Sequence, residues 1–297
     1  METDIKQLAM NIQWFPGHMT KARRMITENT ALVDAVCEVV DARIPYSSRN
    51  PDLDDFVGNK PRLIILNRVD QADFALTKLW NAHFRANAKV LQTDSKSGMG
   101  VDKFSATVRS LLSDKIEENK RKGQTGKRLR VMVVGIPNVG KSSFINRVAK
   151  RKATQTSDKP GVTRGKQWIS LENGIEMLDT PGVLWPKFED QTVAENLAFT
   201  GAIRDSIMDI ETLGANLMSR LSIDYIERIA ERYKIDVSAE LSGFELLTRA
   251  AKKRGFLLPG GVIDTERMAN ILFDEFRGGK LGGITLEQVS RVQMASE

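Results

Sequence analysis

The stretch Gly135-Ile136-Pro137-Asn138-Val139-Gly140-Lys141-Ser142 decides the fold, because it fits the phosphate-binding pattern G-x-x-x-x-G-K-[ST] at every fixed position. The apolar run 131–134 before it predicts a strand, and the segment 143–148 after it predicts a helix. A glycine-rich loop in this position turns backbone N–H groups toward phosphate oxygens. In such a loop Lys141 reaches the β- and γ-phosphates, and the Ser142 hydroxyl faces a Mg²⁺ ion.

Two polar stretches upstream of this loop resemble guanine-recognition motifs. Asn67-Arg68-Val69-Asp70 follows the apolar run 63–66 and resembles N-K-x-D, with arginine in place of lysine. Its aspartate accepts hydrogen bonds from guanine N1–H and the 2-amino group, a donor pair that adenine lacks, and its asparagine ties the loop to the rest of the site. The alternative is an ordinary surface turn. Asp94-Ser95-Lys96-Ser97-Gly98-Met99-Gly100 is similar to the base-contacting pattern S-A-K-x-G-x-G, with aspartate in place of the first serine.

Two further motifs, a first switch at 159–164 and a second switch at 179–182, lie downstream of the phosphate loop. Thr163 lies in the stretch 159–164 and resembles the threonine that completes Mg²⁺ coordination when a γ-phosphate is present. Asp179 ends an apolar run and matches the aspartate that holds Mg²⁺ through water, and the Gly182 N–H contacts the γ-phosphate. The expected nucleotide-binding residues are therefore Asn67, Arg68, Asp70, Ser95, Lys96, Pro137, Asn138, Val139, Gly140, Lys141, Ser142, Ser143, Thr163 and Gly182. The order of base motifs, phosphate loop and switches is that of a circularly permuted GTPase.

The chain resembles the ribosome biogenesis GTPase A family along nearly its whole length. Beyond the motifs above, the resemblance rests on the stretches 14–19, 41–45, 49–51, 260–264 and 276–282. It implies a bacterial assembly factor for the large ribosomal subunit that binds GTP or GDP with Mg²⁺ and hydrolyses GTP slowly on its own. The implied partners are the subunit precursor, its rRNA and its ribosomal proteins. The alternative is a GTP-dependent regulator or RNA-binding module whose hydrolysis is incidental, and the base motifs disfavour an ATPase.

The sequence leaves a gap in the catalytic machinery. Many GTPases carry a glutamine after the glycine of the second switch to orient the attacking water, but Val183 stands there. His18 lies in a Pro-Gly segment and is the best candidate for this role, since neutral imidazole can hold water near physiological pH. The alternative is a structural or RNA-contacting histidine, whereas His83 is expected to be a surface or packing residue. Asn138 resembles the asparagine of potassium-activated GTPases, or it merely stabilises the loop.

Composition sets further bounds on the function. The chain has 297 residues, a formal net charge of +6 and a sequence pI near 9.3. No apolar run approaches the roughly 18 residues that a membrane span needs, and the N-terminus does not resemble a signal peptide, so we expect a cytoplasmic protein. One cysteine, Cys37, and two histidines are too few for a usual structural zinc site. The positive charge is concentrated before residue 200, and the basic linker near 120–130 is either a solvated connector or an RNA contact.

Apolar periodicity predicts an α/β domain and then a helical one. Strands are expected at 33–40, 62–66, 88–92, 131–135, 167–171 and 174–178. Helices are expected at 18–32, 72–86, 101–121 and 142–150, and later at 224–234, 243–253 and 264–276. Alternating strands and helices predict a mostly parallel sheet with helices on both faces. We therefore expect a circularly permuted P-loop GTPase domain over 1–198 and an all-helical, RNA- or ribosome-binding domain over 199–297.

Overall fold

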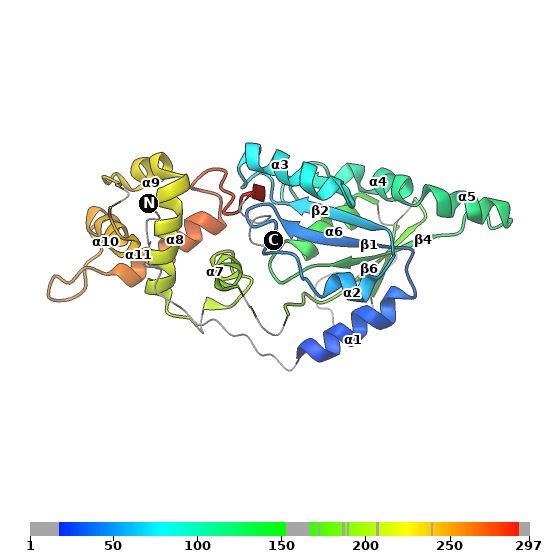
Figure 1. Ribbon diagram of the computed structural model, residues 1–297, viewed down its shortest axis with the longest axis horizontal. Coiled ribbons are helices and arrows are strands. Elements are labelled where there is room, and N and C mark those ends of the chain that lie inside the picture. The colour runs from blue at the N-terminus through cyan, green and yellow to red at the C-terminus, as the bar shows by residue number, and fades with distance from the viewer. Residues whose placement is uncertain are drawn as a thin grey trace. The chain divides into compact units, whose positions relative to one another are not determined.

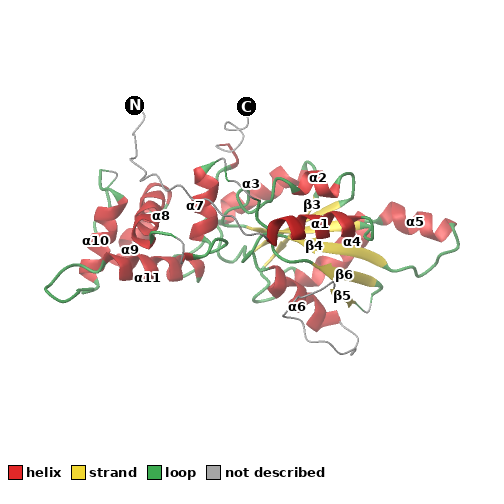
Figure 2. Cartoon of the chain, turned by 90° about the horizontal axis from the view of Figure 1, so that it is seen from below, coloured by secondary structure: helices red, strands yellow, loops and turns green. Residues whose placement is uncertain are grey.

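The structure of the chain is a computed structural model, drawn in Figures 1 and 2. The residues that it describes are 18–152, 167–171, 173–185, 188, 190–205, 208–238 and 240–290. They form two compact units, which we describe separately. The first unit holds the described residues up to 185 together with 287–290, and the second holds those from 188 to 286. Within the described part of the chain, no helix is long and apolar enough to cross a membrane.

The first unit is built on a six-stranded sheet with strand order β3-β2-β1-β4-β6-β5. Every neighbouring pair is parallel except β5 and β6, which are antiparallel. The strands are β1 (Ala35–Asp41), β2 (Arg62–Asn67), β3 (Lys89–Thr93), β4 (Leu129–Val134), β5 (Gln167–Ser170) and β6 (Ile175–Asp179). The six predicted strands and the α/β fold class are thus confirmed. Cys37 lies buried in β1, and burial raises the pKa of its thiol.

Helices cover both faces of this sheet, and Figure 2 shows α2 and α3 on one side with α6 on the other. Ile26, Leu53 and Trp80 pack into the apolar clusters of the first face, whereas the rings of Phe104 and Phe144, on α4 and α6, meet at 5.3 Å. The elements are α1 (His18–Thr30), α2 (Leu53–Val57), α3 (Phe74–Arg85), the 3₁₀ turn η1 (Val101–Lys103), α4 (Phe104–Leu111), α5 (Ser113–Arg121) and α6 (Lys141–Lys152).

The helix predicted over 101–121 is divided into η1, α4 and α5. The break lies at Leu112, whose φ of −105° and ψ of 25° leave the α-helical region. The short helix α2 was not predicted, because five residues are too few to show a helical repeat.

The second unit is helical, as predicted. Its helices are α7 (Gln191–Phe199), α8 (Ile210–Asp224), α9 (Ile226–Tyr233), α10 (Gly243–Lys253) and α11 (Thr265–Arg277). Helix α10 begins close against α8, since a Cβ on Gly243 would lie 1.8 Å from the carbonyl oxygen of Ala215. Periodicity found α9, α10 and α11 but missed α7 and α8. Both missed helices are buried on several sides, so neither carries a single apolar stripe.

The two units divide near residue 188 rather than at the expected boundary of 198/199. Helix α7 belongs with α8, where the buried Glu195 accepts a hydrogen bond from Asn216 at 2.8 Å. The chain also returns to the first unit after the helical one. The buried carboxylate of Glu287 accepts hydrogen bonds from the backbone N–H groups of Tyr46 and Ser47, and its carbonyl oxygen accepts from Trp80 at 2.9 Å.

Candidate functional site

The phosphate loop joins the carboxyl end of β4 to the amino end of α6 (Figure 1). Gly140 has a φ of +89°, and a Cβ there would lie 2.4 Å from Nδ2 of Asn67, so this position requires glycine. Asn138 also takes a left-handed conformation, with a φ of +62°, which asparagine tolerates better than most residues. Ser142 and Ser143 are exposed on the first turn of α6. The predicted hydroxyl ligand is therefore open to a metal ion at the helix N-terminus.

Asn67 fixes the first base loop to both the phosphate loop and the second base loop. Its Nδ2 donates to the carbonyl oxygen of Val139 at 2.9 Å. Its Oδ1 accepts from Thr93 Oγ1 at 3.1 Å and from the backbone N–H and hydroxyl of Ser95 at 3.1 and 2.7 Å. Because Asn67 is buried, these hydrogen bonds are shielded from water. One side chain thus joins three loops that lie far apart in the sequence.

Arg68, which replaces the usual lysine, reaches back to the phosphate loop. Its Nη2 donates to the carbonyl oxygen of Asn138 at 2.9 Å, and its Nε lies 3.5 Å from Oδ2 of Asp41. Asp41 also pairs with Arg43 at 2.7 Å, and both of these side chains are buried. Burial raises the pKa of Asp41, but the two guanidinium groups outweigh it and lower the pKa overall. Arg43 is therefore held inside the protein in an ion pair at the end of β1.

Asp94 shapes the second base loop although it departs from the usual serine. Its carboxylate accepts from the backbone N–H groups of Lys96 at 2.7 Å and Ser97 at 3.0 Å. Burial acts to raise the pKa of Asp94, but its hydrogen bonds outweigh this effect and lower it. Asp70 lies at the surface, at the end of the first base loop. Partial loss of water around its carboxyl, and then the charge of Asp94, raise the pKa of that group. The two base loops therefore bring two carboxylates near each other.

Lys141 and Asp179 meet beside the phosphate loop. The Nζ atom of Lys141 lies 2.5 Å from Oδ1 of Asp179, and both side chains are largely buried. The pair forms because β4 and β6 are parallel neighbours, which places both strand ends at one edge of the sheet. A lysine for phosphate oxygens, a carboxylate for a hydrated metal and the hydroxyl of the adjacent Ser142 fit a nucleotide bound with Mg²⁺.

The second switch packs directly on the phosphate loop. A Cβ on Gly182 would lie 2.9 Å from the backbone nitrogen of Pro137, so only glycine allows this approach. The next residue, Val183, donates its N–H to the carbonyl oxygen of Gly135 at 3.3 Å and accepts from Asn50 Nδ2 at 3.3 Å. Its side chain is 5% exposed and belongs to the apolar cluster beneath α1 and α2. The Val183 side chain is therefore buried in the core and does not face the phosphate loop.

Two of the predicted site residues lie wholly or partly outside the part of the chain that the structure describes. Thr163 lies outside the described residues. His18 is the first residue of α1, and its side chain also lies outside the described part. Since only residues 31–34 separate α1 from β1, the helix runs antiparallel to the strand, and its amino end lies toward the edge that carries the phosphate loop. Ile26 of the same helix packs in the cluster that holds Val183.

Sequence reasoning gave no role to Asn50 or to Asp41, although both lie in stretches that carried the family resemblance. Asn50 holds the backbone of the second switch, and Asp41 anchors two arginines behind the base loop. A buried strand run that ends in a carboxylate, as 35–41 does, was the available signal for the second role.

The permuted order of the loops on one mostly parallel sheet defines a circularly permuted P-loop GTPase. A family model described as "50S ribosome-binding GTPase" matches residues 130–232. Ribosome biogenesis GTPase A of Bacillus cereus is 45% identical over 279 residues, 94% of each chain, and that of Thermotoga maritima is 32% identical over 93% of this chain and 94% of its own. The chain therefore belongs to the ribosome biogenesis GTPase A family.

Solved structures agree with this assignment. A structure described as GDP-bound YlqF of T. maritima has a TM-score of 0.63 and 30% identity, and covers 90% of this chain and 100% of its own. The GNP-bound YlqF of T. maritima has a TM-score of 0.60 and 31% identity, with 90% and 98% covered.

Proposed function

We propose that this protein binds GTP and hydrolyses it on a precursor of the large ribosomal subunit, and leaves the particle after hydrolysis. The observation that carries the nucleotide assignment is the set of hydrogen bonds that Asn67 donates to Val139 and accepts from Ser95, which joins both base loops to the phosphate loop. The family membership supports the ribosomal assignment, because the relatives are named for ribosome biogenesis. In this proposal the partners are rRNA and ribosomal proteins of the precursor, and the protein acts in the cytoplasm.

Each loop has a defined part in this proposal. Asp70 accepts from guanine N1–H and the 2-amino group, while Ser95 and Lys96 border the base. Lys141 leaves Asp179 for the phosphates. Ser142 and Thr163 would hold a Mg²⁺ ion directly, and Asp179 would hold it through water. When bound, the ion would supply positive charge that offsets the negative charge developing during phosphoryl transfer.

Hydrolysis in this proposal needs a group that the second switch does not provide, since the Val183 side chain is buried. His18 at the amino end of α1 orients the attacking water when the protein is bound to the particle. Asn138 helps to hold a K⁺ ion against the phosphates. The K⁺ assignment predicts slower particle-stimulated turnover when Na⁺ replaces K⁺ at constant ionic strength, and equal rates would refute it.

Sedimentation with purified large-subunit precursors tests the ribosomal assignment. We expect the protein to pellet with particles in a non-hydrolysable GTP analogue and to stay in solution with GDP. Binding that is equal in both nucleotides would favour an RNA-binding module with incidental hydrolysis. No binding in either would reject the proposal.

A further inference from the structure

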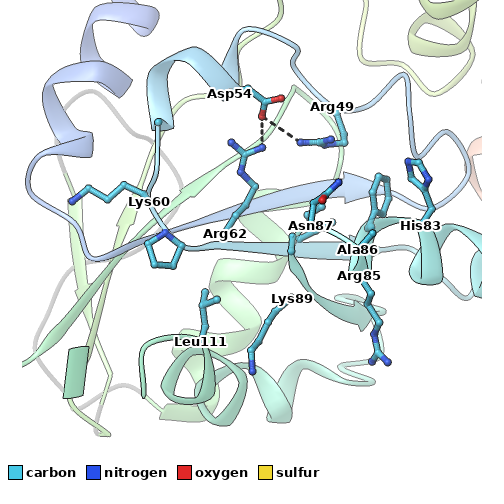
Figure 3. Close-up of a pocket in the computed structure, with 15 residues that line it drawn as sticks. Arg49, Asp54, Lys60, Arg62, His83, Arg85, Ala86, Asn87, Lys89 and Leu111 are labelled. Carbon is cyan, nitrogen blue, oxygen red and sulfur yellow. Dashed lines mark hydrogen bonds and ion pairs between the residues drawn. The ribbon is translucent and has the colours of Figure 1, made fainter. Parts of the chain in front are cut away.

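A basic groove lies at the amino edge of the sheet, opposite to the phosphate loop. It has a volume of about 680 Å³ and is bordered by the starts of β2 and β3, the end of α3 and the turn after α2 (Figure 3). Its cationic side chains are Arg49, Lys60, Arg62, Arg85 and Lys89. None of these five residues has a role in the nucleotide site described above.

Part of this positive charge is balanced inside the protein. Arg62 forms an ion pair with Asp54, the only acidic residue of the groove lining. Arg49 lies 3.7 Å from the same carboxylate and 3.0 Å from the buried Glu38. The charges of these two arginines are therefore neutralised by carboxylates of the protein, and the two residues add little net charge to the groove.

The remaining cations have no such balance among the lining residues. Lys60 donates to the carbonyl oxygen of Val33 at 2.7 Å, and Lys89 donates to the Ser110 hydroxyl at 2.6 Å. Both partners are neutral, so the two ammonium charges are oriented but not cancelled. Arg85 is exposed at the end of α3. The helix dipole accounts for a cation at that end, but not for Lys60 and Lys89, which come from β-strand ends and turns.

The lining favours a phosphate backbone over a protein segment. Protein interfaces need large apolar anchors at their centre. Of the large apolar side chains here, Ile64 and Phe84 are only 2% and 5% exposed, because they belong to the core, and Leu111 alone is partly exposed. A groove of this size with surplus charge and amide groups suits an extended polyanion, which is held by Lys and Arg contacts to its phosphates.

We propose that the basic groove binds the phosphodiester backbone of large-subunit rRNA. The proposal rests on the ribosomal function proposed above and adds a contact site to it. The basic linker is a weaker candidate, because four of its six cations form ion pairs: Lys120 with Glu117, Lys122 with Glu118, and both Arg128 and Arg130 with Glu176. The groove is also separate from the nucleotide, since the six residues of β2 span about 17 Å between its two ends.

The test compares two double variants of the full chain in the presence of a non-hydrolysable GTP analogue. Arg85→Gln with Lys89→Gln removes two groove charges, and Lys78→Gln with Lys103→Gln removes two exposed charges elsewhere in the same unit. The probe is large-subunit rRNA stripped of protein, titrated at several salt concentrations. Equal thermal midpoints and equal GTP affinities would show that the fold and the nucleotide site are intact.

We expect the groove variant to reduce the magnitude of the log–log salt slope by about 1.4–1.8, two contacts at roughly 0.7–0.9 each. The affinity advantage of the parent over this variant should then shrink about 7- to 12-fold between 50 and 200 mM salt. The control variant should keep the parent slope. Equal slopes for parent and groove variant would overturn the proposal.

Binding to precursor particles separates this proposal from the one on which it rests. A parent that binds neither precursor particles nor rRNA refutes the ribosomal function itself. A parent that binds particles, with a groove variant that binds both probes as tightly, refutes only the groove. A groove variant that loses particle binding but keeps its rRNA slope shows that an acidic ribosomal protein occupies the groove, which also overturns the RNA proposal.

Discussion

Replacing Val183 by glutamine restores the residue type that many GTPases use to orient water, yet we expect this change to harm the protein. The Val183 side chain is 5% exposed and packs in the apolar cluster with Ile26 and Val36. Its backbone is held from both sides, by the carbonyl oxygen of Gly135 and the amide of Asn50. A glutamine at this position would therefore place its amide in the core and not at the phosphates.

The expected loss of stability follows from the environment of Val183. Removing the valine side chain loses about 1.5–3 kcal/mol of burial, and burying an amide without partners adds about 1–3 kcal/mol. The sum is about 2.5–6 kcal/mol, against a total stability of about 5–15 kcal/mol for a typical domain. For a domain of 150–250 residues the thermal midpoint should fall by roughly 5–24 °C.

Thermal unfolding and unstimulated GTP turnover check this prediction together. Val183→Ala is the matched control, because it removes two methyl groups, at about 1–3 kcal/mol, and buries no polar group. We expect Val183→Gln to be less stable than this control and to turn over GTP no faster than the parent. A glutamine variant that keeps the parent midpoint and hydrolyses GTP faster would show that the side chain points to the phosphates, and the reasoning would be wrong.

Three further substitutions test the guanine site, the role of His18 and the contact that Glu287 makes within the first unit. Asp70→Asn should weaken GTP binding at least about tenfold, since it replaces a charge-assisted acceptor, and should favour xanthine nucleotides; unchanged affinity in a fluorescent-nucleotide titration would place the base elsewhere. His18→Ala should leave GTP affinity intact and lower particle-stimulated turnover about 100-fold; a change within about twofold would make His18 structural. Glu287→Ala should lower the free energy of unfolding by about 1–3 kcal/mol, because it leaves the N–H groups of Tyr46 and Ser47 without their acceptor. Urea denaturation measures this loss, and an unchanged midpoint and slope would mean that water replaces the carboxylate at no cost.

The sequence predicted those features that a local pattern encodes. All six strands were found, and the signal was strongest for β1, β2 and β4, because parallel strands covered on both faces read as continuous apolar runs. The permuted topology followed from the order of the loops alone. The spacing of Gly135 and Gly140, followed by Lys141 and Ser142, located the phosphate loop, since its backbone geometry depends on glycine at fixed positions.

Features that depend on contacts between distant residues were not predicted. The return of the chain to the first unit depends on Glu287 meeting a turn some 240 residues earlier, and no local signal marks such a contact. The role of Asn50 likewise exists only when β1 and β6 are neighbours of β4. Helix α8 was missed because burial on several sides removes the apolar stripe on which a periodicity argument rests.

The most direct test of the central claim is GTP turnover measured with and without purified large-subunit particles. We predict slow turnover of the protein alone, because Val183 is buried in the core, and a rise of about 100-fold or more with particles, the contribution of one positioning group. The same rise should be absent with small-subunit particles. Turnover that is unaffected by large-subunit particles would contradict the claim that this protein is a GTPase activated by the particle it helps to assemble.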